Sequence, residues 1–362
     1  MAVIIFIMIC VQFVMVAFRQ PDIPVSEIHQ ARIALSEAGK AEAEKYAVKD
    51  YKFTLALWDS LMTEWSEQNQ LFYWKRNFTH LKNLAEKVFI HADLATECAK
   101  NVKCDIQTAT EIDMDLLDSL IMKFDQKYYN LPLDSIIHSN MTQAKMLYAE
   151  GVIAFERKEY HKASELITEC RKLAEHSEDY IKEFLSIYFN NYPQWEKWIS
   201  ETIQWSKKTQ NVAIVVDKIS HKCIVYNKGK LAHEFVVDFG SNWIGYKSHS
   251  GDKATPEGKY FITKKIGSNQ TKYFKALLIN YPNEDDKKRF RNAVKEGAIP
   301  DGRGIGNLIE IHGEGGRGVN WTDGCVALEN NEMDQLFRTV VKGTPVTIIG
   351  STKPLNELYS MD

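Results

Sequence analysis

Residues 309–328 read IEIHGEGGRGVNWTDGCVAL, and this stretch decides how the second half of the chain is interpreted. A short apolar run predicts a strand that ends at His312. A glycine-rich loop follows, and the turn Thr322-Asp323-Gly324-Cys325 then presents a cysteine ahead of a second apolar step. The loop is long enough to fold back, so the pattern can bring His312 and Cys325 together.

A cysteine nucleophile needs a base, because a free thiol has a pKa of about 8.5 and is mostly protonated near neutrality. It also needs exposure to a carbonyl substrate and backbone N–H groups aimed at the developing oxyanion. We therefore predict Cys325 as nucleophile and His312 as base. We expect the oxyanion donors to be the N–H groups of Cys325 and of its glycine neighbours in the motif, Gly324 and Gly313.

Two other interpretations of the histidine and cysteine stay open at this point. Cysteine is often a small core residue, so the pair can be structural. A metal site is the other alternative, because this half of the chain also contains His221, His233 and His249. No two of these residues have the spacing of metal ligands, so we predict no metal and no cofactor.

The rest of the second half has the composition of short strands. Apolar and β-branched runs separated by turn residues predict a mainly antiparallel sheet or sandwich. The expected strands are residues 212–216, 223–226, 234–238, 260–263, 276–279 and 308–311. Helices are expected at residues 284–295 and 331–341.

Three motif blocks in this region resemble the L,D-transpeptidase (YkuD-like) catalytic domain. The first is His312-Gly313 followed, after a glycine-rich spacer, by Thr-x-Gly-Cys at residues 322–325. The second is GDKATPEGKYFI at residues 251–262, similar to the family's Thr-Pro-x-Gly strand entry, and the third is Asp238-Phe239-Gly240 before it. The resemblance implies a β-sandwich-like domain over residues 210–350 that works without a metal.

The resemblance also implies an activity in cell wall biogenesis. Cys325 would attack a donor tetrapeptide stem of peptidoglycan at its L-centre residue, and the terminal D-Ala would leave. The thioester would pass to an amine, which gives a 3→3 cross-link or attaches a protein. The alternatives are an L,D-carboxypeptidase or amidase of the same fold, which releases stem residues or attached protein, and an inactive peptidoglycan-binding module.

One residue departs from the family pattern. Many members carry a histidine two positions before the cysteine, whereas this chain has Asp323. A carboxylate beside a thiolate raises the thiol pKa, so Asp323 must point away or be neutralised, for which Arg317 is the candidate. We expect Arg303 and Arg317 to bind stem-peptide carboxylates, and Trp321, Thr322 and Asp323 to border the donor site. Solvent exposure or core packing is the alternative for these residues.

The first half of the chain is nearly free of glycine, with Gly39 and Gly151 alone before residue 226, and its periodicity predicts helices over residues 25–207. Residues 46–51 and 155–160 echo each other at an offset of 109. This resembles a tetratricopeptide-like array, with an irregular helical bundle as the alternative. Trp195, Trp198 and Trp205 share one helix face, which favours core or a seam over a sugar-stacking or membrane surface. We predict a multidomain α plus β protein whose helical half is a scaffold or binds a protein partner.

The two ends of the chain are predicted separately. Residues 2–18 carry no charge, which predicts an export signal or a membrane anchor over residues 1–19 and a place in the periplasm or cell envelope. Of the cysteines beyond Cys10, Cys98 and Cys104 are close enough to pair, and free thiols are the alternative. A net charge of −3 gives no reason to expect a nucleic acid partner. Residues 351–362 are predicted to be a tail.

Overall fold

The computed structural model describes residues 22–359, which divide into two compact units. The helical unit contains described residues up to 119 together with 144–171. The strand-containing unit contains residues 120–143 and everything described from 172 onward. The change from helix to strand falls near residue 210, but the strand-containing unit also includes helices before it. A domain boundary at residues 207–210 therefore stays a prediction.

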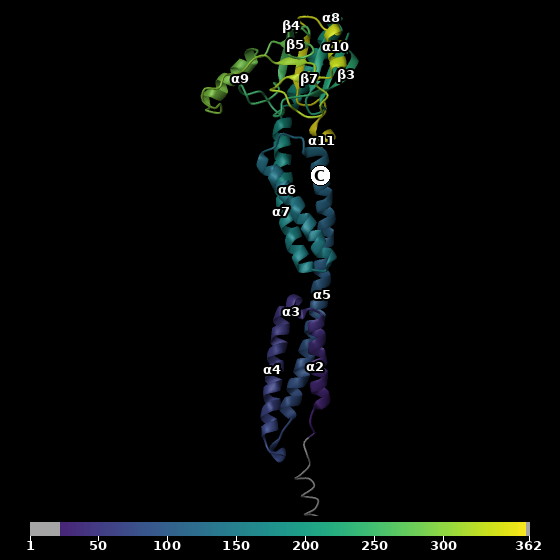
Figure 1. Ribbon diagram of the computed structural model, residues 1–362, viewed down its shortest axis with the longest axis vertical. Coiled ribbons are helices and arrows are strands. Elements are labelled where there is room, and N and C mark those ends of the chain that lie inside the picture. The colour runs from purple at the N-terminus through teal and green to yellow at the C-terminus, as the bar shows by residue number, and fades with distance from the viewer. Residues whose placement is uncertain (1–21, 360–362) are drawn as a thin grey trace, which may run out of the picture. The chain divides into compact units, whose positions relative to one another are not determined.

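Helices occupy most of residues 25–209 (Figure 1), in agreement with the predicted helical half. They are α2 (Val25–Lys40), α3 (Ala43–Tyr46), α4 (Val48–Gln70), η1 (Tyr73–Lys75), α5 (Thr79–Lys123), η2 (Phe124–Tyr128), α6 (Ser135–Glu156), α7 (Tyr160–Phe189) and α8 (Tyr192–Thr209). In the helical unit, Ala31, Leu61, Leu81, Ala85 and Val88 form one buried cluster. The small alanines let the helices approach closely.

Helix length favours the irregular bundle over the tetratricopeptide-like array. The 45 residues of α5 exceed a whole 34-residue tetratricopeptide repeat. The two echoing segments both lie at helix junctions, one between α3 and α4 and the other between α6 and α7. Their similarity therefore reflects the chemistry of two turns.

Of the two alternatives for Cys98 and Cys104, a disulfide or free thiols, the structure has free thiols. Both residues lie inside α5, and both are free. Six residues of α-helix separate them by about 9 Å along the axis, whereas disulfide-bonded Cα atoms lie less than about 7 Å apart.

The strands of the second half form a closed barrel in the order β1-β2-β3-β7-β6-β5-β4-β8. They are β1 (Val212–Asp217), β2 (Lys222–Asn227), β3 (Lys230–Asp238), β4 (Gly258–Ile266), β5 (Ala276–Ile279), β6 (Glu310–His312), β7 (Val326–Leu328) and β8 (Pro345–Ile349). Only β1–β8 and β6–β7 pair in parallel, which confirms the mainly antiparallel α plus β prediction. β7 and β8 were not predicted as strands.

Two strands close the barrel by changing partners along their length. β3 pairs with β2 up to Val236 and then with β7 at Val237 and Asp238. β4 pairs with β8 over Gly258–Phe261 and with β5 from Ile262 onward. The domain that the resemblance led us to expect as sandwich-like is therefore a closed barrel, in which the sheet is continuous.

The remaining helices are α9 (Glu284–Lys295), α10 (Asn330–Thr339) and α11 (Leu355–Leu358). The predicted bounds of α9 are confirmed, and a capping box at Asn283 fixes its start. Described residues 351–359, predicted to be a tail, are instead packed. Tyr359 is buried and stacks on Tyr128 at 5.6 Å between ring centroids.

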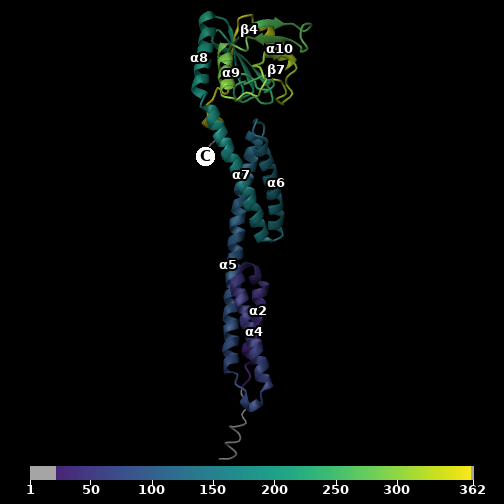
Figure 2. The ribbon, with the colours of Figure 1, turned by 90° about the vertical axis from the view of Figure 1, so that its left-hand side faces the viewer.

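Helix α8 packs along the barrel (Figure 2), and this packing explains the tryptophan face. Trp195 is fully buried, and Thr202 of α8 forms a buried 2.6 Å hydrogen bond with Thr347 of β8. Trp205 is 37% exposed. The face is therefore a seam between a helix and the barrel.

Within residues 22–359, no helix has both the length and the apolar composition needed to cross a bilayer. The anchor or signal predicted over residues 1–19 lies outside the described residues.

Candidate active site

The register of β5, β6 and β7 places His312 and Cys325 on the same side of one ladder. Ala276, His312 and Ala327 are paired across the three strands and form a buried row. Leu278 pairs with Glu310, and the pairing of Ile311 with Val326 brings Glu310 opposite Cys325. Alternate residues of a strand share a face, so a second row lies on the same side as His312. It consists of the half-buried residues Leu278, Glu310 and Cys325.

Cys325 lies at the entrance of β7 with its sulfur held beside β6. The backbone N–H of Glu310 donates to Sγ at 3.4 Å, and the thiol faces the Leu308 carbonyl at 3.8 Å. Burial raises the pKa of the Cys325 thiol to about 11; the Glu310 N–H hydrogen bond lowers this pKa, whereas the charges of Glu310 and Asp323 raise it. The resting cysteine is therefore a thiol that needs a base.

His312 has the tautomer that a base requires. Its Nδ1 lies 2.6 Å from the Gly313 carbonyl, which can only accept, so Nδ1 carries the proton. Its Nε2 is buried and has no hydrogen-bond partner among the described residues. Burial lowers the pKa of His312 to about 4, and the neutral ring keeps a free lone pair on Nε2 near neutral pH.

Two aromatic side chains hold the His312 ring. Tyr273 stacks on it with 3.6 Å between centroids and 10° between planes. Trp321 meets it edge to face at 5.8 Å and 73°. Tyr273 belongs to the loop before β5 and was missed by the sequence analysis, because that loop contains no motif.

The glycine-rich loop is fixed to the end of β3. Buried Asp238 accepts hydrogen bonds through Oδ2 from the Arg317 N–H at 3.0 Å and from Trp321 Nε1 at 3.3 Å. The Phe239 N–H donates to Asn320 Oδ1 at 2.9 Å. The resemblance pointed to Asp238, and its role here is to position the loop that carries Trp321.

The nucleophile turn depends on Thr322 and Gly324. The buried Thr322 hydroxyl donates to the Cys325 carbonyl at 2.8 Å and accepts from the Gly324 N–H at 3.2 Å. Gly324 has φ +121°, and a Cβ there would lie 2.5 Å from the Ala254 carbonyl oxygen. Thr322 therefore holds the turn together and is too buried for the predicted role at the donor site.

The predicted oxyanion donors need a correction. The Gly324 N–H already donates to Thr322, and the Gly313 N–H donates to the Lys275 carbonyl at 3.0 Å. Among residues 22–359, the Cys325 N–H has no acceptor. Of the expected donors, it alone remains available.

The charges around Cys325 also differ from expectation. Asp323 is exposed, and the cation that interacts with its charge is Lys272. The pKa of Lys272 is raised by a hydrogen bond with Tyr273 and by the charges of Cys325 and Asp323. Arg317 instead lies over the Trp321 ring at 3.7 Å and donates from Nε to the Glu314 carbonyl. Arg303 is exposed beside Gly251, and no contact joins it to Cys325 in the described chain.

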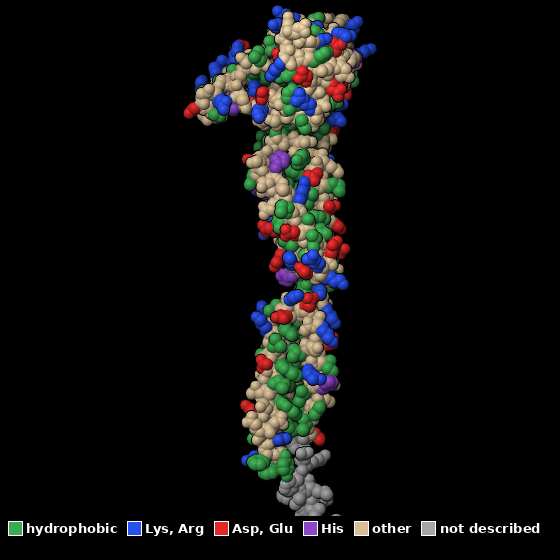
Figure 3. All heavy atoms as spheres, in the orientation of Figure 1, with side chains coloured by type: hydrophobic (Ala, Val, Ile, Leu, Met, Phe, Trp, Pro, Cys, Tyr) green, Lys and Arg blue, Asp and Glu red, His purple; other side chains and the backbone are tan. Residues whose placement is uncertain are grey.

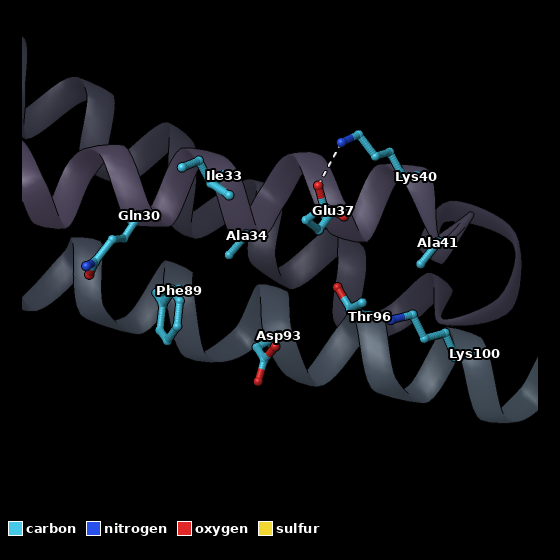
Figure 4. A pocket seen from close by; sticks show the side chains of 10 residues that line it. All are labelled: Gln30, Ile33, Ala34, Glu37, Lys40, Ala41, Phe89, Asp93, Thr96 and Lys100. Carbon is cyan, nitrogen blue, oxygen red and sulfur yellow. Dashed lines mark hydrogen bonds and ion pairs between the residues drawn. The ribbon is translucent and has the colours of Figure 1, made fainter.

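Cavities lie on both units. One of about 420 Å³ is lined by the glycine-rich loop at residues 318–320, by residues 129–132 and by the end of β3. Another, of about 460 Å³, is a groove between α2 and α5 in the helical unit, lined by Ile33, Phe89 and Asp93 among others (Figure 4). In the part of the chain that the structure describes, no cluster of His, Cys, Asp and Glu could hold a metal ion.

Comparison with known proteins identifies the family to which residues 211–348 are similar. Residues 211–348 match the model of the L,D-transpeptidase catalytic domain, YkuD. No curated protein matches the chain.

Among solved structures, the chain is similar to an L,D-transpeptidase from Mycobacterium smegmatis, with 15% identity over 39% of this chain and 59% of that chain, and a TM-score of 0.25. It is also similar to L,D-transpeptidases from Stackebrandtia nassauensis (18% identity, 39% and 56%, TM-score 0.25) and Enterococcus faecium (20% identity, 38% and 50%, TM-score 0.26). The chain thus spans between 50% and 59% of the length of these structures. Residues 211–348, with Cys325 and His312 among them, are an L,D-transpeptidase catalytic domain of the YkuD family.

Proposed function

We propose that this chain is a peptidoglycan L,D-transpeptidase that forms a thioester between Cys325 and a donor tetrapeptide stem. The observation that carries the proposal is the arrangement of β6 and β7. Their parallel register gives His312 and Cys325 a common face; His312 Nε2 has no hydrogen-bond partner within residues 22–359, and Cys325 is partly exposed.

The first half-reaction follows from this arrangement. As Cys325 Sγ attacks the donor carbonyl, the thiol proton moves to His312 Nε2. The Cys325 N–H is the available donor for the oxyanion. Collapse breaks the bond to the terminal D-Ala, whose amine takes the proton from His312, and a thioester remains.

Recognition of the donor needs cations, because stem peptides carry carboxylates. Lys272 and Arg317 are the cations whose charges act on His312, so they are the best placed. Arg303 has less support, since its neighbour is Gly251. We propose that Lys272 and Arg317 attract the donor carboxylates, and that Trp321, whose edge meets His312, borders the donor site.

The test is covalent labelling of the full chain. We expect incubation with a carbapenem to add one acyl group at Cys325, read by intact mass and peptide mapping, and Cys325→Ala to abolish the adduct. No adduct on the wild-type chain would favour a peptidoglycan-binding module without activity. Muropeptide analysis then separates cross-linking from hydrolysis: 3→3 dimers support transfer, whereas tripeptides without dimers support the carboxypeptidase or amidase alternative.

The setting of the reaction is part of the same proposal. Peptidoglycan lies outside the membrane, so we place the chain in the periplasm or cell envelope, tethered through residues 1–19. The helical unit would bind a protein partner. Its support is apolar exposure: hydrophobic side chains gather on the α2, α4 and α5 bundle (Figure 3), and Ile33, Phe53 and Phe89 are between 44% and 52% exposed.

A further inference from the structure

Glu310 lies in this site but has no role in the acylation step proposed above. It lies opposite Cys325 across β6 and β7, on the same face, and its own N–H donates to Cys325 Sγ at 3.4 Å. Its negative charge raises the pKa of Cys325. A carboxylate in this place therefore works against formation of the thiolate.

The Glu310 carboxylate has no partner. It is half-buried, yet within residues 22–359 it forms neither a hydrogen bond nor an ion pair. Two buried acids of the same unit differ in this respect: Asp238 accepts from Arg317 and Trp321, and Asp217 accepts from Ser220 and Thr352. A partly desolvated carboxylate without a protein partner is stabilised by a cation, so this position suits a cationic ligand.

The second half-reaction supplies a ligand of the right chemistry. The acyl acceptor is an amine, and an aliphatic amine with a pKa of about 10.4 is an ammonium ion at neutral pH. An ammonium ion cannot attack the thioester until it loses a proton. Burial raises the pKa of the Glu310 carboxyl while Lys272 lowers it, which makes Glu310 a stronger base than an exposed glutamate.

We propose that Glu310 binds the acceptor ammonium group beside the Cys325 thioester and takes its first proton. This inference rests on the proposed transpeptidase function and assigns its acceptor site. Glu310 is then a catalytic residue of the second half-reaction, whereas His312 serves both.

The proton balance is complete with these two bases. The acceptor R–NH3+ gives one proton to Glu310 and becomes R–NH2. Its nitrogen forms a bond to the thioester carbon, passes a second proton to His312, and the C–S bond breaks with its electron pair on Cys325. His312 returns its proton to the Cys325 thiolate, and Glu310 releases the first proton to solvent.

Two acceptors of different charge test the proposal on the full chain. Nα-acetyl-lysine offers an ammonium group, whereas hydroxylamine is already uncharged at neutral pH. With a tetrapeptide stem as donor, we expect Glu310→Gln to slow transfer to Nα-acetyl-lysine by about 100-fold. We expect transfer to hydroxylamine and the rate of thioester formation to change less than about 3-fold, and Glu310→Asp to restore part of the lost rate.

The controls keep this result separate from the proposed function. Glu296→Gln removes an exposed carboxylate at the end of α9 and should leave both acceptors unaffected. A Glu310→Gln variant that transfers to both acceptors at the wild-type rates, or whose rate falls by the same factor with both, would overturn the role of Glu310. Thioester formation would in that case still support the transpeptidase. Absence of a thioester in the wild-type chain would instead remove the proposed function itself.

Discussion

Cys325 and His312 rest as a neutral pair, because burial moves their pKa values in opposite directions, to about 11 and about 4. Attack on a carbonyl then requires proton transfer during the step. We predict that acylation by a carbapenem rises as pH increases through about 4, where His312 loses its proton. It should then stay flat to about pH 9, which a series of acylation rates will measure.

A thiolate-specific reagent provides the contrast. Alkylation of Cys325 by iodoacetamide, followed at the Cys325 peptide, should keep rising towards pH 11 because it needs the thiolate itself. A bell-shaped acylation profile with limbs near 6 and 9 would contradict the neutral pair and indicate a thiolate–imidazolium ion pair.

Tyr273 stacks on the ring of His312, the proposed base, and we predict that this contact orients the imidazole. Tyr273→Ala removes the stacked ring, so the imidazole can rotate more freely, and we predict a loss of at least about 10-fold in acylation rate. Tyr273→Phe keeps the stacked ring and should retain most of the rate. Acylation kinetics and a thermal melt of both variants measure this, and equal rates in the two variants would mean that the stacking does not orient His312.

The nucleophile turn makes a prediction at the level of a structural element. Gly324→Ala places a methyl group 2.5 Å from the Ala254 carbonyl oxygen at φ +121°, so the turn must open and Cys325 must move. We predict that acylation is nearly lost and that the melting temperature falls. Gly304→Ala is the matched control, because its added Cβ meets nothing within 4 Å. A Gly324→Ala variant as active as Gly304→Ala would contradict this account of the turn.

Elements with a clear sequence pattern of their own, including β1 to β6, were predictable, whereas β7, which is defined by its pairing, was not. The bounds of α9 follow from its own capping residues, whereas β7 has three residues and becomes a strand only between β3 and β6. The same limit applies to the site. The motif predicted Cys325 and His312, and strand alternation could have found Glu310 two residues before His312. Lys272 and Tyr273 come from a loop that only the folded barrel brings to the site.

The matched family domain and the compact unit that contains it have different boundaries. The family match begins at residue 211, but the barrel is held by residues before it. The Tyr188 hydroxyl of α7 donates to buried Glu257 at 2.7 Å, and Glu257 also pairs with fully buried Lys218. Trp243 Nε1 donates to the Asn130 carbonyl. These earlier helices are part of the folded core of the strand-containing unit.

A substitution at Trp195 measures how far the stability of the barrel depends on these earlier helices. It is fully buried, and its ring lies so close to Gly350 that a Cβ there would be 2.3 Å from it. Trp195→Ala in the full chain should destabilise the strand-containing unit by about 3–5 kcal/mol. That loss lowers its melting temperature by about 10 °C or more. Trp205→Ala on the same helix removes a side chain that is 37% exposed and should cost less than half as much.

A fragment of residues 210–362 extends the same argument, because it lacks Trp195 and Tyr188 altogether. We predict that it melts at least as far below the full chain as Trp195→Ala does, and that its acylation by a carbapenem is reduced in proportion to the unfolded fraction. Calorimetry of the two variants and the fragment measures this. A fragment that melts with the full chain's strand-containing unit would show that the barrel is stable without α7 and α8.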